Sequence, residues 1–266
     1  MTTQKDPSPI VCAARDIAAH ISIGSPMTRD TLNQAMQRAF GETNASGSWT
    51  QRSSFEALEA ATVMSATEMI VENNAEQTIK TLRALEQSLP TQTVRSEEQL
   101  ELQQFSTPPS IAFLAAHLAL ATAEDRVLEP SAGTGLLAAM MRHPQSKLIL
   151  NEVDPDRAAI LEALFPDATL HRHDASKLSS LLPDTERPTV IIMNPPFSNS
   201  ITRGEDRNTA ARHLKAAIDY IAPGGRIVAI MPDWFSTNSA NDKVIAHTLE
   251  HASVKLSLRL EKGAYA

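Results

Sequence analysis

The stretch "RVLEPSAGTGLLAAMMRH", from Arg126 to His143, decides the fold of this protein. A short β-rich run leads into a turn that contains Gly133 and Gly135, and a helical run begins at Leu136. Glycines at such a turn let the backbone bend tightly and approach a ligand with no side chain in the way. The glycine pair by itself fits an ordinary tight turn equally well, and no Gly-Lys-Ser/Thr follows to make it a phosphate loop.

Strand and helix patterns alternate along the rest of this region. The β-rich runs lie at 126–130, 147–153, 169–173, 189–193, 226–231 and 253–260. Helical patterns separate most of these runs. The alternation predicts an α/β fold, a Rossmann-like, doubly wound parallel sheet with helices on both faces. Such sheets bind ligands beyond the carboxyl ends of their strands, so the residues that follow each strand are the candidates for a site.

The chain before this region has a helical pattern. Apolar residues recur at helical spacing in 28–41, 54–74 and 76–89. Gly41 ends the first of these segments, and Pro90 ends the last. We therefore expect a helical N-terminal domain over residues 1–100, followed by an α/β domain over residues 101–266. The methionine and leucine stripes of the first domain indicate core packing, and they predict no chemistry for it.

Composition and charge narrow the class of protein. The chain has 266 residues and a net charge of −7, which counts mildly against a stand-alone nucleic-acid binder. Cys12 is the single cysteine, which excludes a disulfide framework and a thiolate metal cluster. The sequence has no run as long as a membrane span and no signal-peptide pattern at its start, so we expect a soluble, cytoplasmic protein.

Acidic residues follow the second and third β-rich runs. Glu152 lies about where nucleoside-binding folds place an acid on the ribose hydroxyls. Asp154 precedes a proline and a helical pattern, so we interpret it as a helix N-cap. Asp174 fits two roles equally well, as a cap of the next helix or as an acceptor for an adenine amino group. His171 and His173 have no third metal ligand, so we expect solvated histidines and no metal site.

The fourth β-rich run ends in "NPPF", from Asn194 to Phe197. An exocyclic amine on a nucleobase is a poor nucleophile because its lone pair is delocalised into the ring. The Asn194 side-chain carbonyl and the Pro195 backbone carbonyl, which Pro196 helps to fix, can accept both amino hydrogens and localise that pair. Phe197 offers a face on which an extruded base stacks, worth roughly 1–3 kcal/mol. The alternative is a turn whose prolines merely end a strand.

Five motifs, taken in this order, resemble the class I S-adenosylmethionine-dependent DNA adenine-N6 methyltransferases: "QQFSTPPSIAFLAAHLA", "EPSAGTG", "NEVDP", "HRHDASKL" and "NPPF". The resemblance covers roughly residues 100–266. The Thr-Pro segment before the glycine turn is similar to the branch whose target-recognition region follows the catalytic domain. More narrowly, the pattern is similar to methylase domains of phage- and plasmid-type methylase-helicase proteins of the strawberry-notch kind. The resemblance implies S-adenosylmethionine as cofactor and DNA as partner.

The resemblance also implies roles for the residues that match its motifs. Thr107 and Pro108 would hold the amino-acid end of the cofactor, Glu152 its ribose and Asp174 its adenine. The full set implied to bind the cofactor is Thr107, Pro108, Glu129, Ser131, Gly133, Gly135, Glu152 and Asp174. The set implied to act on the target base is Asn194, Pro195, Pro196 and Phe197.

The chain departs from the family near its end. The family's sheet closes with an antiparallel hairpin, whereas this chain stops just after the β-rich run at 253–260. We therefore expect a fragment that lacks the last strand and the recognition domain, which further C-terminal domains or a partner protein would supply. Tyr265 sits where the family places a second aromatic near the target base. Arg203 would contact DNA phosphates or lie in a solvated loop.

Three alternatives remain open at this point. The first is an RNA base methyltransferase, and the second is a protein-glutamine methyltransferase. Both can use the same four-residue site, and the side-chain amide of glutamine poses the same nucleophile problem as the amine of a base. The Thr-Pro segment favours the DNA family over both. A non-catalytic module of a larger protein is the third alternative, and the intact Asn-Pro-Pro-Phe sequence argues against it.

Overall fold

The computed structural model describes residues 8–90, 106–141, 147–197, 208–233, 235–237, 241–261 and 264. Its α-helices are α1 (Pro9–Ser22), α2 (Arg29–Phe40), α3 (Gln51–Glu68), α4 (Ala75–Ser88), α6 (Pro109–Ala119), α7 (Leu136–Met140), α8 (Pro155–Leu164), α9 (Leu178–Leu181), α10 (Thr209–Tyr220) and α11 (Asp242–His251). Short 3-10 helices are η1 (Asn44–Ser46), η2 (Ala175–Lys177) and η3 (Asp184–Glu186). The strands are β1 (Arg126–Glu129), β2 (Lys147–Asn151), β3 (Thr169–His171), β4 (Val190–Met193) and β5 (Arg226–Ala229).

These five strands form one parallel sheet in the order β3-β2-β1-β4-β5. In the middle of the sheet, Leu128 of β1 pairs with Ile149 of β2 on one side and with Ile191 of β4 on the other. The strand order reverses between β1 and β4, and in sheets of this kind the reversal leaves a crevice at the carboxyl ends of the two strands. The predicted parallel α/β sheet is confirmed, and its crevice falls between the glycine turn and "NPPF".

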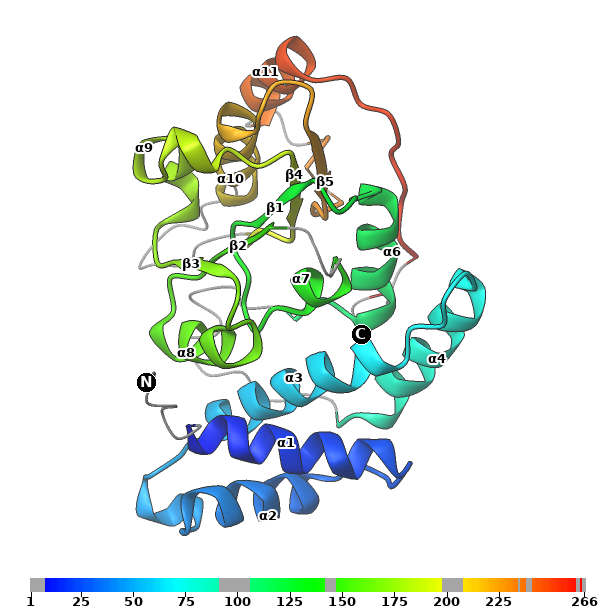
Figure 1. Ribbon diagram of the computed structural model, residues 1–266, viewed down its shortest axis with the longest axis vertical. Coiled ribbons are helices and arrows are strands. Elements are labelled where there is room, and N and C mark those ends of the chain that lie inside the picture. The colour runs from blue at the N-terminus through cyan, green and yellow to red at the C-terminus, as the bar shows by residue number, and fades with distance from the viewer. Residues whose placement is uncertain are drawn as a thin grey trace.

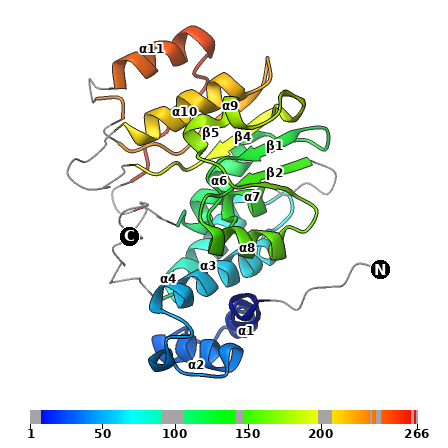
Figure 2. The same ribbon diagram turned by 90° about the vertical axis from the view of Figure 1, so that its left-hand side faces the viewer.

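The middle positions of the central strands are apolar, and β4 is apolar throughout, because both faces of the sheet are covered. Val127, Val190 and Ile192 belong to a core on one face, which α6 and α7 cover. Leu128 and Ile191 belong to a separate core on the other face, together with residues of α9 and α10. Figure 2 shows these helices on opposite sides of the strands, with α11 outside α10.

Helices α1 to α4 form a further layer outside the first face of the sheet, where α3 lies against α7 and α4 against α6 (Figures 1 and 2). Gly41 ends α2 in the left-handed conformation at φ 75°, as the sequence predicts. Ile17 of α1 and Leu82 of α4 are fully buried in the same hydrophobic core as Val127 of β1. The helical layer and the sheet therefore share one core.

The prediction of a sixth strand at 253–260 is wrong. These residues form neither a helix nor a strand of the described sheet, and they are mostly exposed. The alternating Val254, Leu256 and Leu258 are each more than half exposed. Period-two alternation predicts an extended chain, but a strand also needs a partner for its backbone hydrogen bonds, and the pattern carries no information on that partner.

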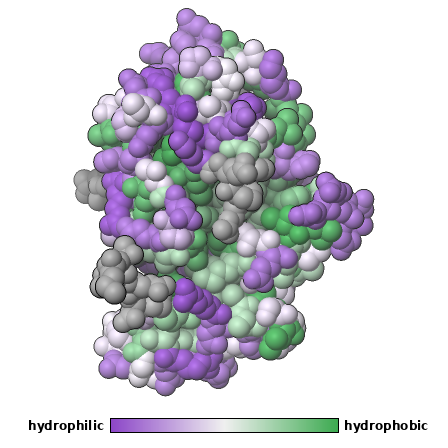
Figure 3. Space-filling view, in the orientation of Figure 1, coloured by the Kyte–Doolittle hydropathy of each residue, from purple (hydrophilic) through white to green (hydrophobic). Residues whose placement is uncertain are grey.

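Polar and apolar side chains are interspersed on the face of the molecule drawn in Figure 3. Such mixing is normal for an exposed protein surface. Within the described ranges, none of the helices combines the length and the apolar character that crossing a bilayer requires.

Candidate cofactor and methyl-transfer site

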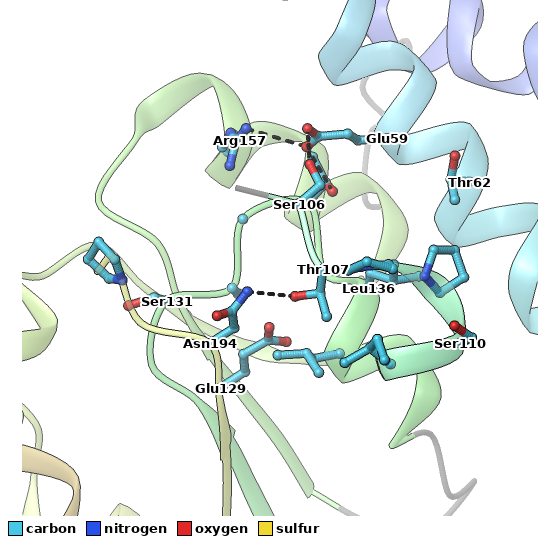
Figure 4. A pocket seen from close by; sticks show the side chains of 18 of the residues that line it. Glu59, Thr62, Ser106, Thr107, Ser110, Glu129, Ser131, Leu136, Arg157 and Asn194 are labelled. Carbon is cyan, nitrogen blue, oxygen red and sulfur yellow. Dashed lines mark hydrogen bonds and ion pairs between the residues drawn. The ribbon is translucent and has the colours of Figure 1, made fainter. Parts of the chain in front are cut away.

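A cavity of about 1370 Å³ opens at the carboxyl ends of the strands, where the crevice between β1 and β4 lies. One wall consists of the turns that follow β1, β2, β3 and β4. The opposite wall comes from α3, α4 and the segment 106–111 that leads into α6. Figure 4 shows side chains from both walls pointing toward one another. The helical layer is thus part of the site.

Asn194 lines this cavity and faces Thr107 (Figure 4). Its side-chain nitrogen donates a 2.9 Å hydrogen bond to Oγ1 of the buried Thr107. Its side-chain oxygen, Oδ1, is buried and has no hydrogen-bond partner in the described part of the chain. Since a buried carbonyl without a donor is costly, this oxygen is suited to accept a hydrogen from a ligand. Pro195 is buried behind it, and Pro196 lines the cavity.

The turn after β1 is held by the acid after β2. One carboxylate oxygen of Glu152 accepts the Gly133 N–H at 2.7 Å, and the other accepts the Asp154 N–H at 2.8 Å. Gly133 lies in the left-handed region at φ 55° and lines the cavity together with Glu152. Burial raises the pKa of Glu152, although these two hydrogen bonds and the charge of Arg157 oppose the rise. Contact of Glu152 with a ribose remains a prediction.

The placement of Gly135 differs from the one that the resemblance implies, because this residue is not part of the cavity lining. It has a φ of 94°, and a Cβ added to it would lie 2.4 Å from the Phe165 ring and 2.8 Å from Leu161. Gly135 therefore permits the turn to pack against α8. Ser131 and Gly133 do line the cavity. The two glycines of this motif therefore have different roles, because Gly133 lines the cavity and Gly135 leaves room for the Phe165 ring.

Glu129 is 2% exposed at the base of the cavity and accepts the Ala138 N–H of α7 at 2.8 Å. Complete burial raises the pKa of Glu129 well above its ordinary value, and the neighbouring Glu152 carboxylate raises it further. A cation in the cavity would favour the ionised forms of both acids.

Asp154 and Asp174 both cap helices. Asp154 accepts the Asp156 N–H at 2.9 Å and the Arg157 N–H at 3.2 Å, which confirms the predicted N-cap. Asp174 accepts the Ser176 N–H at 2.9 Å and caps η2, while it also lines the cavity. Burial acts to raise the pKa of Asp174, but the hydrogen bonds from Ser176 act in the opposite direction, and the pKa is lowered. Its predicted contact with adenine remains untested by this geometry.

Sequence reasoning missed several groups in the site. Glu59 of α3 and Glu86 of α4 line the cavity from the helical layer, and His213 of α10 lies 3.5 Å from the hydroxyl of Ser131. Burial lowers the pKa of His213 to about 4, so its ring is neutral at neutral pH. One signal was available: Glu59 is a charged residue within the apolar run "FEALEAATV". Acids at buried helix positions are rare unless they are paired.

Some predicted site residues are not placed in the cavity. Phe197 is half-buried and follows Pro196, but it does not line the cavity. Pro108 does line it, next to Thr107. Arg203 and Tyr265 lie outside the described residues. His173 lines the cavity, whereas His171 pairs with Glu186 at 2.7 Å.

A parallel sheet in the order 3-2-1-4-5, with a glycine turn after β1, an acid after β2 and a cavity at their carboxyl ends, defines a class I methyltransferase domain. The chain belongs to the methyltransferase small domain family, whose model matches residues 109–255, more than half of the chain. Its cofactor is S-adenosylmethionine. No curated protein matches the chain.

Solved structures share this fold at low sequence identity. A Listeria monocytogenes protein described as a class I S-adenosylmethionine-dependent methyltransferase is 18% identical, with a TM-score of 0.50 over 90% of this chain and 79% of that chain. A Vibrio vulnificus YJ016 protein described as a type I restriction modification subunit is 13% identical, with a TM-score of 0.48 over 82% of this chain and 47% of that chain. A Pyrococcus horikoshii protein described as an RNA methyltransferase is 20% identical, with a TM-score of 0.45 over 65% and 81% of the two chains.

The residues present fit this cofactor. S-adenosylmethionine carries a sulfonium and an ammonium group, and when bound it supplies an electrophilic methyl group. The cavity holds several acids for a cationic ligand, among them Glu59, Glu129 and Glu152. It also holds the glycine turn, which leaves room for close approach of a ligand to the backbone.

Proposed function

We propose that this methyltransferase transfers the methyl group of S-adenosylmethionine to the exocyclic N6 amine of adenine in DNA. The observation that carries the proposal is the buried Oδ1 of Asn194, an acceptor without a protein donor in the described part of the chain. Thr107 holds the amide nitrogen, so the carbonyl is the end of the side chain left for a ligand. An exocyclic amine supplies the hydrogen that this oxygen lacks.

In this proposal the acceptors act on the amine and no strong base is needed. Asn194 Oδ1 accepts one amino hydrogen and the Pro195 carbonyl accepts the other, which localises the nitrogen lone pair. The lone pair then forms the new nitrogen–carbon bond as the carbon–sulfur bond breaks and its electrons stay on sulfur. The nitrogen afterwards gives up one proton to water. Positioning and electrostatics supply the rate enhancement.

The size of the cavity supports an acceptor as well as a cofactor. At about 1370 Å³ it exceeds the roughly 300–1,000 Å³ of a pocket for one small ligand. Arg83 of α4 and Arg259 of the C-terminal segment line it, and both residues are exposed. Exposed arginines at a cavity suit contact with phosphates, which position a nucleic acid without reading its sequence.

The test is methyl transfer from S-adenosylmethionine labelled in its methyl group. Duplex and single-stranded DNA, RNA of the same sequence, and a glutamine-containing peptide serve as acceptors, and the product base is identified by mass spectrometry. N6-methyladenine in DNA, lost in Asn194→Ala with cofactor affinity retained, is the expected result. If RNA or the glutamine peptide is methylated and DNA is not, DNA is not the acceptor. Asn194 would then keep its proposed role toward the NH₂ group of the other acceptor.

A further inference from the structure

We infer that Glu59 of α3 binds the ammonium group at the amino-acid end of S-adenosylmethionine, so that the helical layer completes the cofactor site. The inference concerns only the cofactor and does not depend on which amine accepts the methyl group. It assigns chemistry to a part of the chain whose sequence predicts packing alone.

The position of Glu59 is the first argument. Its carboxylate accepts a hydrogen bond from the hydroxyl of Ser106 (Figure 4). It also lies 3.5 Å from the hydroxyl of Thr134 in the glycine turn. Ser106 directly precedes Thr107, whose hydroxyl holds Asn194. Glu59 thus bridges the glycine turn and the segment before α6, on the wall of the cavity opposite the strands.

The second argument compares Glu59 with the other acids that line the cavity. Of the other five, Glu86, Glu129, Glu152 and Asp174 accept backbone N–H groups that hold helices or turns in place. Withdrawing any of these four carboxylates would leave a backbone donor without its bond. The fifth, Glu261, is exposed in the C-terminal segment, away from the glycine turn in the sequence. The partners of Glu59 that the structure shows are all side chains, namely Ser106, Thr134 and Arg157. A carboxylate can accept several hydrogen bonds at once, so Glu59 can bind an ammonium group while it keeps its contact with Arg157.

The third argument is that Glu59 is held at the cavity by buried charges. Arg157 of α8 lies 3.4 Å from Glu59 and 3.5 Å from Glu56, one turn earlier on α3. Arg52 of α3 in turn pairs with Asp154 at the start of α8. The Arg157 side chain is 6% exposed and that of Glu59 is 16% exposed, so water screens the pair little. These contacts fix α3 against the strand-side wall, and Glu59 is the acid among these five residues that lines the cavity, beside Arg157.

The negative charge around Glu59 also suits a cationic ligand. Arg157 is shared among Glu56, Glu59, Glu152 and Asp154, so within the described ranges these acids outnumber the guanidinium groups seen to pair with them, Arg52 and Arg157. A cationic ammonium group beside Glu59 would reduce this excess of negative charge. A neutral ligand at the same place would not.

The experiment measures the affinity of the full chain for S-adenosylhomocysteine and for 5′-methylthioadenosine by calorimetry. The second compound keeps the adenine and the ribose but lacks the amino-acid end. Glu59→Gln keeps the shape of the side chain and removes its charge. We expect this variant to weaken S-adenosylhomocysteine binding roughly tenfold to hundredfold and to leave 5′-methylthioadenosine binding within about twofold.

Glu56→Gln is the matched control, because Glu56 shares Arg157 with Glu59 but does not line the cavity. It should leave the ratio of the two affinities unchanged, whatever it does to the melting temperature. Equal weakening of both compounds by Glu59→Gln would place Glu59 at the ribose or in a purely structural role and would overturn the inference. An unchanged affinity for S-adenosylhomocysteine would overturn it as well. Absence of methyl transfer to DNA would bear only on the proposed acceptor.

Discussion

The side-chain nitrogen of Asn194 donates a 2.9 Å hydrogen bond to Oγ1 of Thr107, and this bond decides which end of the amide is left for a ligand. Asn194 follows β4, whereas Thr107 precedes α6, so residues far apart in the sequence meet at one point of the cavity. A bond that orients a group in a reaction is expected to affect rate more than ground-state affinity.

Thr107→Val tests this relationship, because valine keeps the shape of threonine and removes the hydroxyl. The Asn194 amide would lose its fixed orientation, and we expect kcat to fall roughly ten- to hundredfold. Single-turnover methyl transfer and cofactor calorimetry measure the rate and the affinity separately. A weaker cofactor affinity with an unchanged rate would assign Thr107 to the cofactor and not to the amide.

Glu152→Gln tests the contact between the glycine turn after β1 and the turn after β2. Glutamine can still accept one of the two N–H bonds that Glu152 accepts from Gly133 and Asp154, but it carries no charge. We expect cofactor affinity to fall roughly tenfold or more, because a cationic ligand loses a nearby acid and the glycine turn loses a contact. Calorimetric titration measures this loss. Unchanged affinity would contradict a role for Glu152 in binding.

Gly135→Ala and Gly133→Ala separate the two glycines. At Gly135, a Cβ would lie 2.4 Å from the Phe165 ring, so we expect the free energy of unfolding to fall by roughly 2–5 kcal/mol. At Gly133, the nearest atom to a Cβ is an Arg157 nitrogen at 3.3 Å, so the loss should be nearer 1–2 kcal/mol. Urea unfolding measures both. A smaller loss for Gly135→Ala than for Gly133→Ala would contradict the packing role of Gly135.

His213 makes stability depend on pH. Burial lowers its pKa from 6.5 to about 4, so between these values the unfolded chain binds a proton that the folded chain does not. The free energy of unfolding therefore falls as the pH drops through this window, and His213 contributes a loss of about 2 kcal/mol between pH 7 and pH 5. Urea unfolding of wild type and His213→Gln at both pH values measures this difference. The variant should lose less stability than the wild type does, and equal losses would count against the buried, neutral ring.

The sequence by itself determined the sheet and the order of its motifs. Strand runs, the glycine turn and the proline after Asp154 are local signals, because backbone conformation and helix capping depend on neighbours along the chain. The same signals predicted the helix stop at Gly41 and the cap at Asp154, and both are confirmed. They also predicted that Asn194, Glu152 and the glycine turn lie at one edge of the sheet, because the carboxyl ends of parallel strands lie at the same edge.

Only the tertiary structure decided which distant residues meet. The run at 253–260 has the alternation of a strand but pairs with no described strand, and Gly135 faces the Phe165 ring instead of the cavity. Glu59 has the sequence environment of a core helix, yet α3 packs against α7 and places its carboxylate at the glycine turn. Periodicity indicates that a helix face or strand is buried, but the packing of remote segments sets which atoms it is buried against.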